Sequence, residues 1–320
     1  MKQYIIRRVL AMIPVLIGIS LLVFLVFAMA PGDAITGVMD PHATAQSRAK
    51  LRHELHLDKP KIVQYGYWIG GAIKGDLGQS TYYKEPVGRV INDYIWNSFY
   101  LALASTIASI LLAIPIGVIS ATRQYSFFDS FFTVIALVGI SVPSFFLGLL
   151  LMKSLSIDLS IFPISGMLTT GSKATGFAKL GDYLYHMFLP FLVLTFTSIA
   201  GIMRYMRSSM LEVIRQDYVR TARAKGLKEK VVIYKHALRN ALIPVITLLG
   251  FMIPGLFGGA IITEQIFGWP GIGPVQMLAV SNRDYPLLMG TTMLLAVLTL
   301  IGNLIADISY ALVDPRIRLK

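Results

Sequence analysis

Six long apolar blocks dominate this sequence of 320 residues and restrict what it can fold into. Hydrophobic residues make up 55% of the chain and charged residues only 14%, whereas charged residues form about a quarter of a soluble globular domain. Each block is long enough to cross a hydrocarbon core about 30 Å thick as an α-helix. We therefore predict an all-α, polytopic membrane protein with six transmembrane helices. The blocks are approximately residues 9–30, 99–121, 130–152, 186–203, 241–263 and 290–313.

The first block follows a basic N-terminus and ends at the small-residue sequence Ala28-Met29-Ala30. Those features are also typical of a secretory signal peptide. A signal peptide has an apolar region of about 7 to 15 residues, whereas residues 9–30 form a run of 22. We therefore predict an uncleaved first transmembrane helix.

The distribution of Lys and Arg predicts the orientation of the spans. Seventeen basic residues against five acids fall in the N-terminus, the 121–130 connection, the 204–239 segment and the C-terminus. The segments on the other side carry twelve basic residues against eleven acids. Basic residues that flank spans are retained in the cytoplasm, so we predict that both termini are cytoplasmic. Topology thus accounts for the net charge of +12, and we expect no nucleic-acid partner.

Three regions follow from this topology. Residues 1–30 form the first transmembrane helix, and residues 31–97 form an extracytoplasmic region that is too small for a robust core of its own. We expect this region to fold as a cap against the spans. Residues 98–320 form a core of five further spans with a cytoplasmic loop at 204–240. The outer segment at 154–185 has the Gly, Pro, Ser and Thr content of an irregular loop.

The cytoplasmic loop contains a basic, alanine-rich segment with the periodicity of a helix. Apolar side chains recur every four residues from Met206 to Ala222, which predicts an amphipathic helix over residues 204–225. Gly226 would end this helix, because glycine accepts the left-handed conformation found at helix C-termini. A basic helix could also lie on anionic lipid, but acids interrupt the basic face here and the end of the helix is small. The small residues, Thr221, Ala222, Ala224 and Gly226, favour insertion into a protein cleft.

This segment resembles the signature cytoplasmic loop of binding-protein-dependent ABC importer permeases, in the form used by the dipeptide and oligopeptide branch. The general pattern opens with Glu-Ala-Ala and places Gly four residues after the second Ala. This chain has Arg220-Thr221-Ala222 and then Gly226, so Ala222 and Gly226 match while Arg220 and Thr221 depart. The distance from Gly226 to Pro244 is also longer than in the general form, and these departures favour the peptide branch.

Further motifs resemble the same family in order along the chain, and the long loop after the first span resembles the first permease of a peptide transporter pair. The motifs are Leu57-Asp58-Lys59-Pro60, Gln64-Tyr65, Gly75-Asp76-Leu77-Gly78, Ser141-Val142-Pro143-Ser144-Phe145, Trp269-Pro270-Gly271-Ile272-Gly273, Arg283-Asp284-Tyr285-Pro286 and Asp314-Pro315-Arg316-Ile317-Arg318.

The resemblance implies a type I ABC importer permease fold and the import of di- or oligopeptides delivered by an extracytoplasmic binding protein. It also implies a second homologous permease, two ATP-binding subunits and a place in the bacterial or archaeal cytoplasmic membrane. The chain has no G-x-x-x-x-G-K-[ST] motif, so we expect no catalytic residue and no cofactor in it, with ATP and Mg²⁺ on the partner subunits. The residues expected to contact an ATPase are Asp217, Tyr218, Val219, Arg220, Thr221, Ala222, Arg223, Ala224, Lys225, Gly226 and Leu227.

Several polar or aromatic residues are weaker candidates for function. Hydroxyl groups in the spans either line a wet path or bond back to helix carbonyls. Aromatic residues on rigid turns are common interface anchors, although Trp269 also suits the aromatic belt of the membrane interface. The candidates for the substrate path are Ser141, Ser144, Thr195, Thr197 and Asn303. The candidates for docking the binding protein are Trp269, Pro270 and Tyr285.

Other classes of protein fit the sequence less well. Asp307 is the only charge well inside a span, and we expect it to pair with a basic loop residue, which disfavours a secondary carrier. We expect no metal site, because His53 and His56 fail the H-E-x-x-H spacing. Nickel complexes, glutathione and oligosaccharides are the alternative cargoes within the same architecture.

Overall fold

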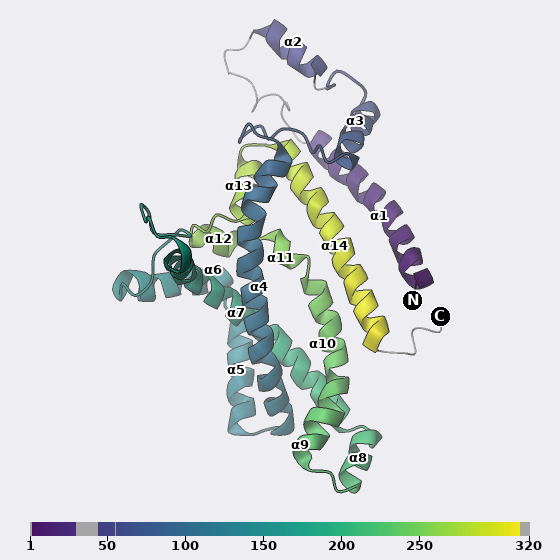
Figure 1. Cartoon of the computed structure of the whole chain (residues 1–320), viewed down its shortest axis with the longest axis vertical. Coiled ribbons are helices and arrows are strands. Elements are labelled where there is room, and N and C mark those ends of the chain that lie inside the picture. Colours follow the sequence, from purple (N-terminus) through teal and green to yellow (C-terminus); the bar gives the residue numbers. More distant parts are fainter. Residues whose placement is uncertain (1, 30–43, 55, 314–320) are drawn as a thin grey trace.

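The structure is a computed structural model that describes residues 2–29, 44–54 and 56–313. Within these ranges the chain folds into helices and contains no strand, which confirms the all-α prediction (Figure 1). The predicted motif at 314–318 lies outside the described residues. The helices are α1 (Lys2–Ala28), α2 (Ala45–Glu54), α3 (Lys61–Ile73), α4 (Val87–Thr122), α5 (Phe127–Ser141), α6 (Ser144–Leu151), η1 (Met152–Asp158), α7 (Gly176–Ile214), α8 (Asp217–Ala224), α9 (Glu229–Val231), η2 (Val232–Ala237), α10 (Leu238–Met252), α11 (Gly255–Gly258), α12 (Ile261–Ile266), α13 (Ile272–Ser281) and α14 (Tyr285–Val313).

Five helical stretches of the described chain are long and apolar enough to cross a membrane. A sixth span requires α5 to be joined with α6 and η1, which follow it at an angle of 101°. Five of the six predicted spans are thus present as continuous helical stretches, and the third is present if the bent pair counts as one span. Helix α4 begins at Val87 instead of residue 99, and α7 begins at Gly176 instead of residue 186. The five continuous stretches are Ile5–Ala28, Val87–Thr122, Gly176–Ile214, Glu229–Ile266 and Tyr285–Ile308.

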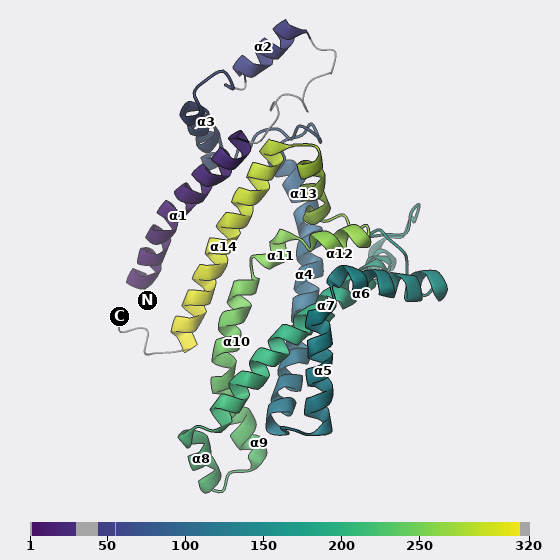
Figure 2. The ribbon, with the colours of Figure 1, turned by 180° about the vertical axis from the view of Figure 1, so that it is seen from behind.

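The bend between α5 and α6 has a local cause in Pro143. Proline has no N–H to donate to the preceding helical turn, and its ring disfavours the helical conformation in the residue before it. Val142 accordingly has φ of −80° and ψ of 120°, which is extended backbone. The next helix, α6, leaves the bundle sideways near α12 (Figures 1 and 2). The third predicted span is therefore not a straight helix.

The core of the bundle forms where α4 packs along α7. Gly117 of α4 permits this approach, because a Cβ atom there would lie 2.7 Å from the Met206 Cβ and 2.9 Å from the Met203 carbonyl oxygen. Buried side chains from α4, α7, α8, η2 and α10 surround this contact and form one continuous cluster. On the other side of α10 lies α14, which in turn packs against α1 (Figure 2).

The N-terminal helix α1 is held at both ends. Near its outer end, the Ser20 hydroxyl lies 2.8 Å from the Tyr65 hydroxyl of α3, and apolar side chains of α1 and α3 pack together. Near its other end, Arg8 Nη1 lies 3.1 Å from Asp307 Oδ2 of α14. Asp307 is therefore ion-paired as the sequence predicted, but its partner belongs to a helix and not to a loop.

Candidate functional site

The predicted coupling segment, residues 217–227, forms a short helix at one end of the molecule (Figure 1). The single helix predicted for residues 204–225 is wrong, because α7 continues to Ile214 and α8 is a separate helix that begins at Asp217. Between them, Gln216 is extended with φ of −71° and ψ of 149°. The end of the helix is as predicted: Gly226 has φ of 73°, and its N–H donates to the Arg223 carbonyl at 2.9 Å.

Helix α8 has one face buried by the chain itself. Val219 is 0% exposed and Ala222 is 5% exposed, and both belong to the cluster that includes Met210 of α7 and Val232 of η2. The spacing of three residues between Val219 and Ala222 places them on one side of the helix. The prediction that Ala222 belongs to an exposed helix tip is therefore wrong. Thr221, Ala224 and Gly226 are exposed.

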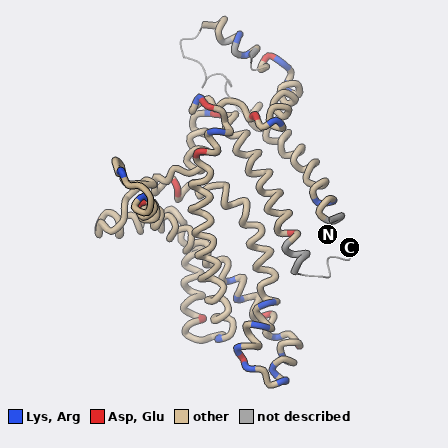
Figure 3. Tube along the Cα trace, in the orientation of Figure 1, with Lys and Arg blue, Asp and Glu red and all other residues tan. Residues whose placement is uncertain are grey.

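The exposed side of the coupling segment is strongly basic. Lys and Arg gather around α8 and α9, as Figure 3 shows. Arg223 bridges the loop between these helices, with its Nη2 2.8 Å and its Nε 3.2 Å from the two Glu229 carboxylate oxygens. This hydrogen bonding raises the pKa of Arg223. The remaining cations are accessible to a partner, and they include Arg220, Lys225 and Lys228.

The candidate path residues are not brought together at one place. Ser141 and Ser144 flank the bend between α5 and α6, whereas Asn303 lies on α14, which packs against α10 and α1. Thr197 donates its hydroxyl to the Val193 carbonyl at 3.0 Å, as in the helix back-bonding alternative. Thr195 is buried, and its hydroxyl has no hydrogen-bond partner among the described residues.

Trp269 is an internal residue of the outer hairpin, which we define as residues 260–273. Its side chain is 0% exposed, its Nε1 donates to the Asn97 carbonyl at 3.1 Å, and its ring lies 5.3 Å from the Tyr183 ring. Both predictions for Trp269, a docking anchor and a residue of the aromatic belt, are therefore wrong. Pro270 and Tyr285 are half-buried.

Glu264 is the residue of this hairpin that the sequence interpretation missed. Its side chain is 1% exposed, and its carboxylate accepts hydrogen bonds from the N–H groups of Ala260 at 3.1 Å and Gly273 at 2.9 Å. A Cβ atom on Gly271 would collide with both the Glu264 carboxylate and the Ser98 hydroxyl. The Glu264 carboxylate lies so close to the backbone of the Trp-Pro-Gly-Ile-Gly motif that a side chain at Gly271 or Gly273 would collide with it. This contact explains why both positions are glycine. The sequence did contain a signal for this buried acid, because Glu264 lies between Gly258-Gly259 and the glycines at 268, 271 and 273.

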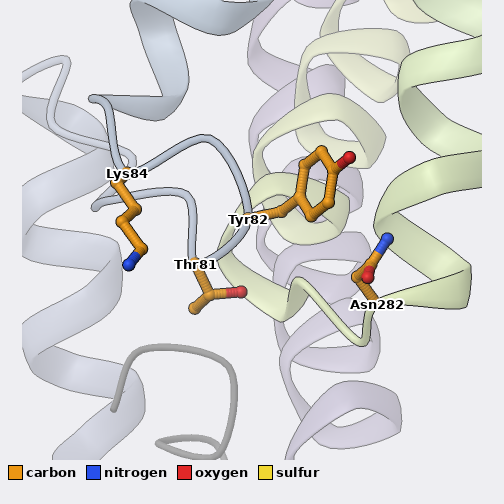
Figure 4. Close-up of a pocket in the computed structure, with 4 residues that line it drawn as sticks. All are labelled: Thr81, Tyr82, Lys84 and Asn282. Atoms are coloured by element: carbon orange, nitrogen blue, oxygen red, sulfur yellow. The ribbon is translucent and has the colours of Figure 1, made fainter. Parts of the chain in front are cut away.

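Asp284 plays a similar part where two outer loops meet. It is 0% exposed and accepts hydrogen bonds from the Ser80 hydroxyl at 2.5 Å, the Tyr82 N–H at 3.1 Å and the Leu287 N–H at 3.2 Å. The carboxylate therefore fixes the 79–86 loop to the start of α14. Beside this junction lies a cavity of about 170 Å³, shown in Figure 4. It is lined by Thr81, Tyr82, Lys84 and Asn282.

The described histidines do not form a metal site. His53 Nδ1 lies 2.9 Å from an Asp58 oxygen, and the ring of His56 stacks on Tyr67 at 4.0 Å. The hydrogen bond with His53 lowers the pKa of Asp58. Within the described ranges, no three His, Asp or Glu side chains are grouped as metal ligands.

The helical spans and the exposed basic segment define the chain as a polytopic membrane protein. Its residues 113–319 match the model of the family described as binding-protein-dependent transport system inner membrane component, and residues 1–93 match the model of the N-terminal region of such components. The chain therefore belongs to this family of ABC importer permeases.

Curated relatives match over the full length. The oligopeptide transport system permease protein AppB of Bacillus subtilis is 46% identical and covers 99% of both chains. The dipeptide transport system permease protein DppB of Escherichia coli K12 is 39% identical, and the glutathione transport system permease protein GsiC of Salmonella typhimurium is 37% identical, each over 100% of both chains.

A solved structure supports the fold. A chain of the MetNI methionine ABC transporter, in an inward-facing conformation, matches with a TM-score of 0.52 and 15% identity. The match covers 70% of this chain and 96% of that chain. Together with the family match, this likeness confirms the predicted permease fold.

Proposed function

We propose that this chain is a membrane-spanning subunit of an ATP-driven importer whose cargo is di- or oligopeptides delivered by an extracytoplasmic binding protein. The observation that carries this proposal is the 46% identity to an oligopeptide permease over nearly the whole of both chains. The dipeptide permease at 39% identity supports the same cargo class. Glutathione is the second candidate cargo, because a glutathione permease is 37% identical over the full length.

The coupling segment is the proposed contact with the ATPases. Its accessible side offers cations and small residues, a surface that is complementary to an acidic cleft. Val219 and Ala222 support this surface from beneath by packing on the chain's own core. Two ATP-binding subunits hold ATP and Mg²⁺, and a second homologous permease completes the pore. Closure of the ATPases would move the coupling segment and rock the spans between inward and outward access.

We place the coupling segment and both termini on the cytoplasmic side of a bacterial or archaeal cytoplasmic membrane. The bias of Lys and Arg toward this end supports the orientation (Figure 3). Because the chain has no cysteine, single substitutions provide clean probes. A cysteine in Lys50→Cys should react with a membrane-impermeant thiol reagent in intact cells, and one in Lys228→Cys only after permeabilisation. The reverse pattern would overturn the orientation and the ATPase contact.

The binding protein would dock on the outer loops instead of on Trp269. The support is the junction at Asp284, which holds the 79–86 loop and the start of α14 in one piece. Exposed Tyr82, Lys84 and Asn282 surround the cavity at this junction (Figure 4). Pro270 and Tyr285 are half-buried and contribute at most their accessible edges.

Reconstitution tests the function and the cargo together. The complete transporter is placed in proteoliposomes with its binding protein inside or outside, and ATP hydrolysis and uptake are measured with peptides of two to five residues and with glutathione. We expect peptide-loaded binding protein to stimulate hydrolysis and uptake. If only glutathione stimulated hydrolysis and uptake, the cargo would be glutathione instead of peptides, and the chain would still be an importer permease. Uptake without any ATPase subunit would overturn the class itself.

A further inference from the structure

An ion pair joins α5 to α7 through two residues, Asp129 and Arg207, that are 78 positions apart in the sequence. Arg207 of α7 donates through Nε to Asp129 Oδ1 at 2.7 Å and through Nη2 to Asp129 Oδ2 at 2.8 Å. The Asp129 side chain is 5% exposed and that of Arg207 is 26% exposed. A two-pronged contact of a guanidinium with a carboxylate fixes orientation as well as distance.

Further bonds fix the carboxylate to its own turn. Asp129 Oδ2 accepts the Tyr125 N–H at 3.0 Å, and Oδ1 lies 3.4 Å from the Thr133 hydroxyl. The Asp129 N–H donates to the hydroxyl of Ser126, which caps α5. Arg207 therefore holds the entire turn between α4 and α5, and not only one side chain.

The position of Arg207 connects this turn to the coupling segment. Its neighbours on α7, Met206 and Met210, are 0% exposed and share one buried cluster with Val219 and Ala222 of α8. One face of the C-terminal end of α7 thus packs against α8, while Arg207 on the same end binds α5. Beyond α5 the chain passes the 101° bend into α6, which lies beside α12 and α7.

We propose that Asp129 and Arg207 are positioning residues that make α5 move together with the end of α7 and the coupling segment during transport. The inference rests on the proposed contact of the coupling segment with the ATPases. A buried ion pair contributes little net stability compared with an apolar pair of the same shape, but it is strongly directional. The pair thus passes a displacement of α7 on to α5 and to α6, which follows the bend.

The first test measures coupling in the purified complete transporter. Asp129→Asn and Arg207→Gln each remove one charge, Arg207→Lys keeps the charge without the two-pronged geometry, and Asp129→Arg with Arg207→Asp reverses the pair. Lys153→Gln is the matched control, because it breaks an exposed ion pair of 2.6 Å with Asp158 on η1. Uptake per ATP hydrolysed and attachment of the ATPases are both recorded.

We expect Asp129→Asn and Arg207→Gln to keep the ATPases attached while uptake per ATP falls about tenfold. Arg207→Lys should lose less, the reversed pair should regain part of the uptake, and Lys153→Gln should match the parent. Unchanged uptake per ATP, with only the amount of protein reduced, would show that the pair is merely structural. Failure of the ATPases to bind the parent chain would instead overturn the proposed function.

The second test needs no disruptive variant of the pair. Spin labels on Val134→Cys of α5 and Tyr205→Cys of α7 report the separation of the two helices, and both positions are exposed. In the complete transporter, we expect the same distance distribution without nucleotide and in a hydrolysis-arrested ATP state. Adding Asp129→Asn should broaden or shift it between these states. A large shift of the label-to-label distance between the two states, with Asp129 and Arg207 unchanged, would overturn the inference.

Discussion

The two ends of the molecule hold their loops in different ways. At the end that we propose to be outside, called the outer end below, Glu264 and Asp284 are almost fully buried and accept hydrogen bonds from backbone N–H groups and a hydroxyl. At the opposite end, which carries the coupling segment, Arg–carboxylate pairs connect separate elements, as in Asp129–Arg207 and Arg223–Glu229. Buried acceptors with many donors fix one conformation. The two-pronged Asp129–Arg207 pair also fixes orientation, whereas the exposed Arg223–Glu229 pair breaks and reforms at small cost. The outer end is therefore a rigid framework, whereas the opposite end combines one fixed connection, between α5 and α7, with an adaptable loop between α8 and α9.

Trp269→Ala should have the largest effect if the outer end is a rigid framework. The substitution leaves a large cavity and removes the bond to Asn97, so we expect a loss of about 3–5 kcal/mol in stability. Thermal unfolding of the purified chain and its abundance in membranes are the measurements. Trp96→Ala is the control, because Trp96 is 45% exposed. Normal abundance with weaker stimulation by the binding protein would restore Trp269 as a docking anchor.

Glu264→Ala should follow closely. It strands the N–H groups of Ala260 and Gly273 in a buried place, which costs about 2–4 kcal/mol. Glu264→Gln keeps one acceptor oxygen and should cost less, and the exposed Glu85→Ala should cost almost nothing. The melting temperatures of the three variants give the order. Equal melting temperatures for Glu264→Ala and Glu85→Ala would show that the outer hairpin is not held by its carboxylate.

Ala222→Glu and Ala224→Glu distinguish two roles in the coupling segment: packing of α8 on the chain's own core, and contact with the ATPases. Ala222 faces the buried cluster and Ala224 faces outward. We expect Ala222→Glu to detach α8 from η2 and to make residues 215–228 sensitive to protease, because a carboxylate is expensive to bury. Ala224→Glu should leave the segment resistant and still weaken attachment of the ATPases by altering the accessible surface. Full attachment with Ala224→Glu would place the ATPase contact elsewhere.

Gly226→Val should have the smallest effect on stability. A branched side chain at φ of 73° costs about 1 kcal/mol locally, and no other atom lies within 4 Å of the added Cβ position. Membrane abundance should therefore remain near normal, while uptake falls because the coupling segment is tilted. Gly70→Val, in α3, provides the comparison at a glycine with equal space and no positive φ. Equal uptake in both variants would contradict a special role for position 226.

Local signals in the sequence were sufficient for the spans, the end of α8 and the pairing of Asp307. Hydropathy identifies a span because the whole segment must be apolar, and Gly226 reveals a helix end by its own backbone freedom. The split of the predicted 204–225 helix was missed, since apolar periodicity continues across Arg215 and Gln216. The sequence Val142-Pro143 marks a break, but the angle of 101° depends on what α6 packs against.

Burial of polar residues was beyond local reasoning. Glu264 and Asp284 stand in segments that look like surface loops, and their partners Ser98 and Ser80 are more than 160 positions away. Asp129 and Arg207 were both placed on the cytoplasmic side by charge bias, yet nothing in the sequence connects them. The wrong predictions for Trp269 and Ala222 have the same cause. Trp269 is covered by Asn97 and Tyr183, which are distant in the sequence, and Ala222 is covered by α7 and η2, against which α8 folds.

The Ser98 to Ile272 contact also has a consequence for biosynthesis. The hydroxyl that accepts the Ile272 N–H is made 174 residues before its donor, and the chain leaves the ribosome from its N-terminus. The outer end of α4 therefore waits in the membrane, without its hairpin, until most of the chain has been translated. The outer framework thus closes late in synthesis, and a chain released before residue 264 presents an unfinished outer surface.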